Sequence, residues 1–142
     1  TVDLSAVVAD VAEAFRPSME SSGHQLVVSI TPRVTLPGDR RLLQQMLTNL
    51  LDNAVQHTPR GTTVRIGLDL ADDRIRLSIT DDGPGVEEHD APELFNRFAR
   101  VDRSRSTPGH GLGLAMVAAI VAAHSGKAAI ASRPGFGVHI TV

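Results

Sequence analysis

The sequence has no cysteine, no tryptophan and no tyrosine, and it has only four phenylalanines among its 142 residues. Without cysteine it forms no disulfide, no thiolate metal site and no cysteine nucleophile. No apolar run reaches the roughly 18 residues that a membrane-spanning helix requires. The first residues also lack the pattern of a signal peptide. The missing cysteine fits a reducing compartment.

No charge of either sign dominates. The 14 Lys and Arg residues stand against 16 Asp and Glu residues, which gives a formal net charge of −2. This balance excludes a generally basic nucleic-acid-binding protein and a solvating acidic tail. Hydrophobic residues make up 42% of the chain, enough for the buried core of about one domain. The chain begins at Thr1 rather than Met, so we expect a piece of a longer protein.

Hydrophobic periodicity predicts three main helices and several short strands. The helices are expected at about 3–21, 39–57 and 111–124, with a short fourth helix at about 93–98. The strands are expected at about 24–30, 34–36, 64–70, 75–79, 128–132 and 138–142, with a turn at 71–73. Residues 99–110 are predicted to form a mobile surface loop. The fold class is therefore an α/β two-layer sandwich, in which a mixed, largely antiparallel sheet packs on three main helices.

A polar stripe runs along the second predicted helix, opposite its apolar face. Its members are Gln45, Asn49, Asp52, Asn53 and Gln56. Asparagine is a poor helix former, so two of them one turn apart cost some stability. One interpretation is a solvated helix face. The other is a site where amide oxygens bind a hard cation and its phosphate ligands, since Mg²⁺ prefers oxygen and keeps several waters.

An acidic, glycine-containing turn follows the predicted strand at 75–79. It begins with Asp81 and contains Gly83 and Gly85. One interpretation is an ordinary tight turn, since Asp-Gly and Pro-Gly form turns readily. The other is a purine site, in which the carboxylate accepts a hydrogen bond from an exocyclic amino group and the glycines let the backbone approach the ring.

A glycine-rich segment opens the third predicted helix at residues 109–114. It is either a flexible loop with a helix cap or an anion site, because free N–H groups and the helix dipole attract phosphate. Two better-known phosphate loops do not fit. The only Gly-Lys pair is followed by Ala128 instead of Ser or Thr, and Gly113 comes one residue too early for a dinucleotide fingerprint.

In this order and spacing, the three features resemble the ATP-binding catalytic domain of bacterial sensor histidine kinases. That family lies within the superfamily of gyrase, heat-shock chaperone and mismatch-repair ATPases. Residues 49–57 look like the N box, 81–86 like the first glycine box, 93–98 like the F box, 100–106 like the ATP lid, and 109–114 like the second glycine box. The resemblance implies one catalytic domain over 1–142, a lid at approximately 99–110, and no phosphoacceptor domain in this chain.

The resemblance implies an ATP site with Mg²⁺ as the metal cofactor. Asn53 is then the main Mg²⁺ ligand, with Asn49 close to the metal or the phosphates, and Asp81 accepts from the adenine amino group. Asn53, Arg100 and Gln56 are the residues expected to serve phosphoryl transfer. The further nucleotide-binding residues implied are His57, Gly83, Gly85, Val86, Phe98, Arg103, Gly109, His110, Gly111, Leu112, Gly113 and Leu114.

The implied reaction transfers the γ-phosphate of ATP to a histidine on a separate dimerisation helix. None of the six histidines lies in such an acceptor context, so we expect ATP binding without autophosphorylation by this chain alone. His24, His124 and His139 are expected to be edge or core residues. The implied partners are the phosphoacceptor helices of the same kinase and a response regulator, with no nucleic acid and no direct membrane contact. A monomeric cytoplasmic domain of a membrane-anchored protein is expected.

Three positions depart from the family pattern. Gln56 stands where many members carry Lys or Arg, so a γ-phosphate contact is either missing or supplied by the lid. His110 stands where a small or amide residue is common, so the phosphate contacts at this position are expected to depend on pH. Val138 replaces the usual Ser or Thr after the final Gly-x-Gly, which removes a hydroxyl from that position.

Three other functions remain open. An anti-sigma-factor serine kinase keeps the fold and changes the acceptor, but the F box and the Arg-rich lid argue against it. A nucleotide-gated, non-catalytic scaffold is disfavoured because Asn49, Asn53 and Asp81 are intact. A gyrase-type ATPase requires a glutamate base in the N box. This chain offers Asp52 there, which is expected to face away from the phosphates or to pair with an Arg.

Overall fold

Three helices form close to where the apolar spacing predicts them. The computed structural model describes residues 1–83, 110–131 and 137–142. Its helices are α1 (Leu4–Ser21), α2 (Arg40–Gln56) and α4 (His110–Ala123). Asp3 and Asp39 precede α1 and α2, and their carboxylates accept hydrogen bonds from Ala6 N at 3.1 Å and Leu42 N at 3.2 Å. These two N-caps set where the helices begin.

Within the described residues, seven strands form two sheets. They are β1 (Val2–Asp3), β2 (Gln25–Ile30), β3 (Thr35–Leu36), β4 (Thr63–Ala71), β5 (Arg74–Asp81), β6 (Lys127–Ala131) and β7 (Gly137–Thr141). The main sheet has the order β2-β4-β5-β7-β6, in which only β2 and β4 pair in parallel. The predicted mixed, largely antiparallel sheet is confirmed. The two-residue strands β1 and β3 pair antiparallel in a small sheet that the sequence pattern did not predict.

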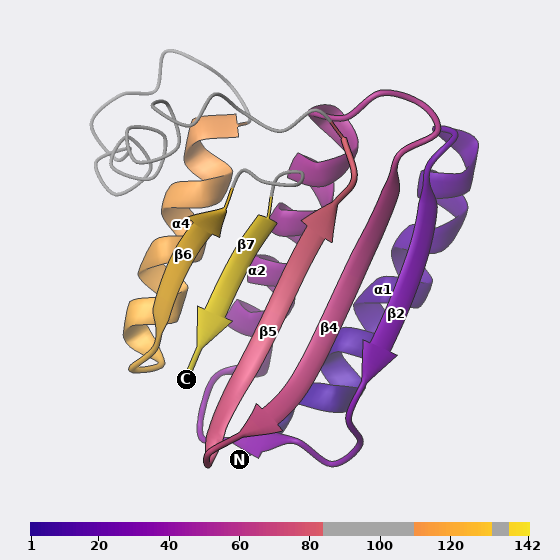
Figure 1. Ribbon diagram of the computed structural model, residues 1–142. Coiled ribbons are helices and arrows are strands. Elements are labelled where there is room, and N and C mark those ends of the chain that lie inside the picture. The colour runs from indigo at the N-terminus through magenta and orange to yellow at the C-terminus, as the bar shows by residue number, and fades with distance from the viewer. Residues whose placement is uncertain (84–109, 132–136) are drawn as a thin grey trace.

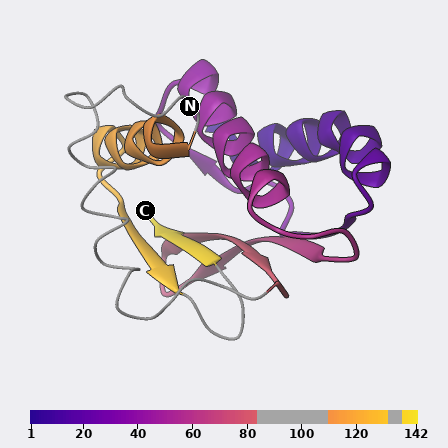
Figure 2. The same cartoon turned by 90° about the horizontal axis from the view of Figure 1, so that it is seen from above.

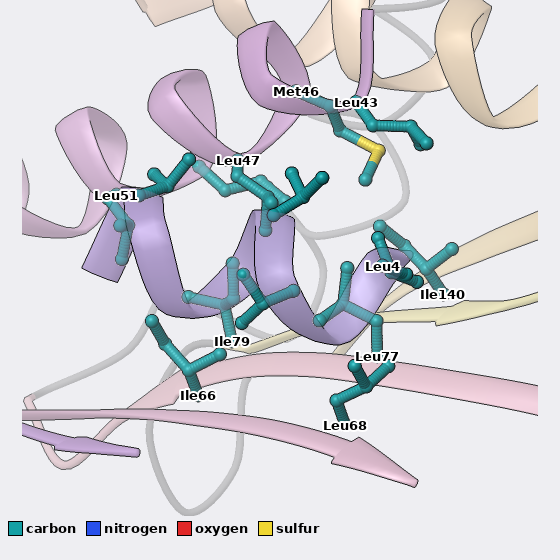
Figure 3. Packing of buried hydrophobic residues seen from close by; sticks show 14 of the residues in the cluster. Leu4, Leu43, Met46, Leu47, Leu51, Ile66, Leu68, Leu77, Ile79 and Ile140 are labelled. Carbon is teal, nitrogen blue, oxygen red and sulfur yellow. The ribbon is translucent and has the colours of Figure 1, made fainter. Parts of the chain in front are cut away.

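The three helices cover one face of the main sheet (Figure 1), and the view along the sheet separates the two layers (Figure 2). Leucines of α2, including Leu47 and Leu51, pack above the apolar side chains of β4 and β5, such as Ile66 and Ile79 (Figure 3). Fully burying a side chain of this size contributes about 1.5–3 kcal/mol each. This packing holds α2 against the centre of the sheet.

A tight turn aligns the central hairpin. Asp72 and Asp73 have φ angles of 53° and 62°, and positive φ at both central residues is typical of a type I′ turn. The resulting register places Val64 opposite Asp81, so that Asp81 is the last residue of β5. The turn at 71–73 and the position of Asp81 at the end of a strand are both confirmed.

The glycine-rich segment lies partly inside a helix. α4 begins at His110, close to the predicted start at about 111, and Gly111 and Gly113 lie in its first turn. The predicted short helix at 93–98 and residues 99–109 of the predicted loop lie outside the described residues. None of the helices in the described ranges is both long and apolar enough to cross a membrane.

Candidate functional site

Three polar segments meet at one end of the sandwich. α2 ends, β5 ends and α4 begins at the top of Figure 1. Asn49 Nδ2 of α2 lies 3.4 Å from Met116 Sδ of α4, so the polar stripe faces the middle of that helix, about one turn beyond Gly113. A Cβ added at Gly83, after β5, would lie 3.3 Å from the methyl carbon of Thr58, which follows α2. The three motifs that the sequence separates are therefore adjacent in space.

The amide of Asn49 is oriented from both sides. Gln45 Nε2 donates to Asn49 Oδ1 at 3.1 Å, and Asn49 Nδ2 donates to Met116 Sδ. An amide oxygen has two lone pairs, so Asn49 Oδ1 keeps acceptor capacity beside the Gln45 contact. Asn53 is half-buried one turn further along the same face. The two amides form a ridge that runs towards the end of α2.

The remaining polar residues of α2 are more exposed. Asp52 and Gln56 are exposed, and within the described ranges Asp52 makes no ion pair. Of the two expectations for Asp52, pairing with an Arg is therefore not seen in this part of the chain. His57 is the exposed C-cap residue of α2, with its backbone N–H on Asn53 O at 3.1 Å. Gln56 and His57 lie at the same end of the molecule as the amide ridge.

The carboxylate of Asp81 is held by the turn that follows it. Asp81 is 9% exposed, and its Oδ1 accepts a hydrogen bond from Gly83 N at 2.9 Å. A carboxylate accepts several hydrogen bonds at once, so this contact orients Asp81 and is compatible with a bound amino group. The neighbouring Asp82 instead extends the pairing of β5 with β4, because its Oδ1 accepts a hydrogen bond from Thr63 N at 2.8 Å.

The first turns of α4 bring backbone N–H groups to this end of the molecule. They are formed by His110, Gly111, Leu112, Gly113 and Leu114. The first four N–H groups of a helix have no partner within the helix, and the helix dipole favours an anion beside them. A phosphate chain placed between the amide ridge and this helix start would face the side-chain amides of α2 and the backbone N–H groups of α4.

Several predicted site residues lie outside the described ranges. They are Gly85, Val86, Phe98, Arg100, Arg103 and Gly109. Val138 is described, and it is 4% exposed in β7, where it pairs with Ile79 and Ile130. Its side chain therefore belongs to the core. The sequence interpretation missed Thr58 and Met116, which contact the site from positions that carry no motif signal.

The donor set fits a hard cation accompanied by phosphate. No group of three or more His, Cys, Asp or Glu side chains that could hold a metal is found in the described ranges. Asn49 and Asn53 offer two amide oxygens on one helix face. Mg²⁺ needs only one or two protein oxygens when phosphate oxygens and waters complete its shell. The residues present therefore fit a Mg²⁺ ion whose remaining ligands are nucleotide phosphate oxygens and waters.

Comparison with known proteins identifies the family of this chain. The family described as histidine kinase-, DNA gyrase B-, and HSP90-like ATPase matches residues 38–142. The signal transduction histidine-protein kinase BaeS of Escherichia coli (strain K12) is 38% identical over 143 residues, which cover 99% of this chain and 31% of BaeS. This chain thus spans only a part of that relative.

Solved structures resemble this chain over almost its whole length. The mycobacterial sensor histidine kinase MprB is 33% identical with a TM-score of 0.81, over 99% of this chain and 94% of that one. Full-length ShkA in complex with AMPPNP is 30% identical with a TM-score of 0.78, over 99% of this chain and 29% of ShkA. This chain belongs to the histidine kinase-, DNA gyrase B-, and HSP90-like ATPase family, as an ATP-binding catalytic domain of the sensor histidine kinase type.

Proposed function

We propose that this domain binds Mg-ATP where α2, β5 and α4 meet, and donates the γ-phosphate to a histidine on the dimerisation domain of the same sensor kinase. The observation that carries the proposal is the meeting of three motifs at one end of the sandwich. Asn49 reaches Met116 of α4, and Gly83 lies against Thr58. A nucleotide placed there spans a carboxylate, an amide ridge and a helix start.

Asp81 recognises the adenine. Its buried carboxylate, oriented by Gly83 N, accepts a hydrogen bond from the exocyclic amino group. Guanine carries a carbonyl oxygen at that position, which a carboxylate repels. Gly83, together with Gly85 and Val86, lets the backbone approach the ring closely, and His57 stacks at the end of α2.

Asn53 holds Mg²⁺, and Asn49 lies beside the same metal or the phosphates. When bound, Mg²⁺ neutralises charge on the phosphate oxygens as the phosphoryl group leaves. The N–H groups of residues 110–114 surround the phosphate chain. Gln56 is neutral, so Arg100 supplies the positive charge at the γ-phosphate. Phe98, Arg103 and Gly109 complete the site.

The acceptor and the downstream partner lie on other domains. The AMPPNP complex of full-length ShkA, a similar protein, supports nucleotide binding by this chain. The similarity to BaeS and MprB favours a histidine acceptor over the serine of an anti-sigma-factor kinase. The domain (residues 1–142) then acts as a cytoplasmic monomer, on the phosphoacceptor helices of a membrane-anchored kinase that passes phosphate to a response regulator.

Calorimetry with ATP, in the presence of Mg²⁺ or of EDTA, tests the metal site. The wild-type chain should bind ATP more tightly with Mg²⁺, and Asn53→Ala should bind equally weakly in both conditions. Gln44→Ala is the matched control, because residue 44 lies about 2.5 turns away, on the opposite side of α2. Gln44→Ala should keep the Mg²⁺ dependence. An Asn53→Ala variant that also keeps it refutes the ligand role.

A further inference from the structure

We propose that Thr58 and His24 are positioning residues of the nucleotide site. In this scheme buried His24 holds the hydroxyl of Thr58, and the methyl group of Thr58 supports the turn that orients Asp81. The inference rests on the proposed function, because it assigns Asp81 to the adenine. Neither residue belongs to a motif that the sequence indicates.

The hydrogen bonds of Thr58 have only one consistent direction. Thr58 Oγ1 lies 2.6 Å from Ala54 O and 2.7 Å from His24 Nε2. A carbonyl oxygen only accepts, so the single hydroxyl proton of Thr58 goes to Ala54 O. His24 Nε2 must then carry a proton and donate it to Thr58 Oγ1. His24 Nδ1 is buried and has no partner in the described part of the chain, so the Thr58 contact is the principal polar contact of this ring.

The orientation of the hydroxyl sets the orientation of the methyl. Both groups are attached to the β-carbon of Thr58, so holding Oγ1 also places Cγ2. Thr58 Cγ2 lies 3.3 Å, and Thr58 Cβ 3.7 Å, from the point that a Cβ of residue 83 would occupy. Asp81 Oδ1 lies 3.1 Å from the same point. The methyl of Thr58 therefore packs against the glycine whose N–H holds the Asp81 carboxylate.

His24 is held in place by burial and by a backbone hydrogen bond. It is 5% exposed, and its backbone N–H donates to Met19 O at 2.8 Å at the end of α1. Its two neighbours tie the segment after α2 to the start of β2. Gly61 N donates to Gly23 O at 2.8 Å, and Gln25 N donates to Thr62 O at 3.0 Å. The contacts thus run from the edge of the sheet through His24 and Thr58 to Gly83 and Asp81.

The test is the ratio of Mg-ATP affinity to Mg-GTP affinity, measured by calorimetry on variants shown to be folded by circular dichroism. A purely structural role lowers the unfolding midpoint and leaves this ratio unchanged among folded molecules. His24→Leu, which removes the donor, should lower the ratio about tenfold, the size expected for a disturbed hydrogen bond to a charged group. His24→Gln, which keeps an N–H donor of similar reach, should stay close to the wild type.

One further variant tests the methyl group of Thr58 separately, and another serves as a control. Thr58→Ser keeps both hydrogen bonds and removes only the methyl that faces Gly83, so it should also lower the ratio. His124→Leu is the matched control, since it removes a hydrogen-bonded histidine at the far end of α4. It should lower stability and keep the ratio.

The outcomes distinguish this inference from the function on which it rests. A wild-type chain that does not bind Mg-ATP overturns the proposed function, and one that binds ATP and GTP equally overturns the assignment of Asp81 to the adenine and the positioning role with it. A wild-type preference that survives in folded His24→Leu, or in Thr58→Ser, overturns the positioning role alone. If His24→Leu does not fold, Thr58→Ser decides the question.

Discussion

Two adjacent carboxylates at the end of β5 have different surroundings. Asp81 is buried and accepts a hydrogen bond from Gly83 N, whereas Asp82 is exposed and accepts from Thr63 N. The first is the carboxylate that we propose for the adenine, and the second extends the pairing of β4 with β5. Asp81 is the last residue of β5, whereas Asp82 follows the strand and its side chain turns to Thr63 at the start of β4.

Asp81→Asn should weaken ATP binding by about 1–3 kcal/mol, because it replaces a charged acceptor with a group that also presents a donor to the adenine. Calorimetry with Mg-ATP measures the loss. Asp82→Asn is the control, since it removes the same charge one residue away and keeps an oxygen for Thr63 N. Equal affinities in the two variants would contradict the assignment of Asp81 to the base.

Sequence reasoning finds residues whose type carries the signal, and it misses residues that act through contacts. Asn49 and Asn53 are unusual in mid-helix, so they are noticed from sequence alone. Thr58 and His24 are 34 positions apart, and their contact requires β2 to lie beside β4. No local pattern encodes that pairing, so it emerges only from the folded chain.

Among the secondary-structure elements, one histidine joins the end of α4 to the start of α2. His124 Nδ1 donates to Ile120 O at 2.8 Å, and His124 Nε2 accepts from Asp39 N at 3.1 Å. Because a backbone N–H only donates, Nδ1 carries the ring proton. A Cβ added at Gly38 would lie 2.5 Å from His124 Cδ2. The ring therefore needs a glycine at position 38.

Gly38→Ala should lower the free energy of unfolding by about 1–3 kcal/mol, the range for overpacking a well-fitted contact. Urea denaturation of the single and double variants measures it. In Gly38→Ala combined with His124→Ala, the clash is gone, so the double variant should lose less than the sum of the two single losses. Strict additivity would show that the ring and residue 38 do not meet.

The helices could be predicted more fully than the strand pairings. α1 runs from Leu4 to Ser21, as its periodicity and the Asp3 cap predict. A strand was predicted at about 34–36 and is confirmed as β3, but its two-residue partner β1 is too short for an alternating pattern, so their pairing was not predicted. The start of α4 could be predicted only approximately, because glycines weaken the local helix signal there.

On the scale of the whole molecule, the residues of the proposed nucleotide site lie at one end of the sandwich. α2 and β5 end there and α4 begins there, whereas the hairpin turn at 72–73 and the end of α4 lie at the opposite end (Figure 1). The sandwich class and the mixed sheet were predictable from periodicity. Periodicity does not show which ends of the elements lie side by side, because that depends on the topology. Only the family resemblance implied that the motifs meet.

The chain alone should bind ATP and should not phosphorylate itself, because none of its six histidines lies in an acceptor context. Incubation with radiolabelled ATP followed by gel autoradiography checks this. A phosphoacceptor helix fragment from a sensor kinase, with its histidine intact or replaced by Gln, provides the comparison. Label on this chain in the absence of the fragment would contradict the assigned division between catalytic and acceptor domains.

The most direct measurement is a nuclear magnetic resonance titration of the isotope-labelled chain with Mg-ATP. If α2, β5 and α4 form one nucleotide site, the largest backbone amide shifts should fall together on Asn49, Asn53, Asp81, Gly83 and residues 110–114. The turn at 72–73 and His124, at the other end, should stay unchanged. Shifts centred on that other end, or on only one of the three segments, would contradict the account.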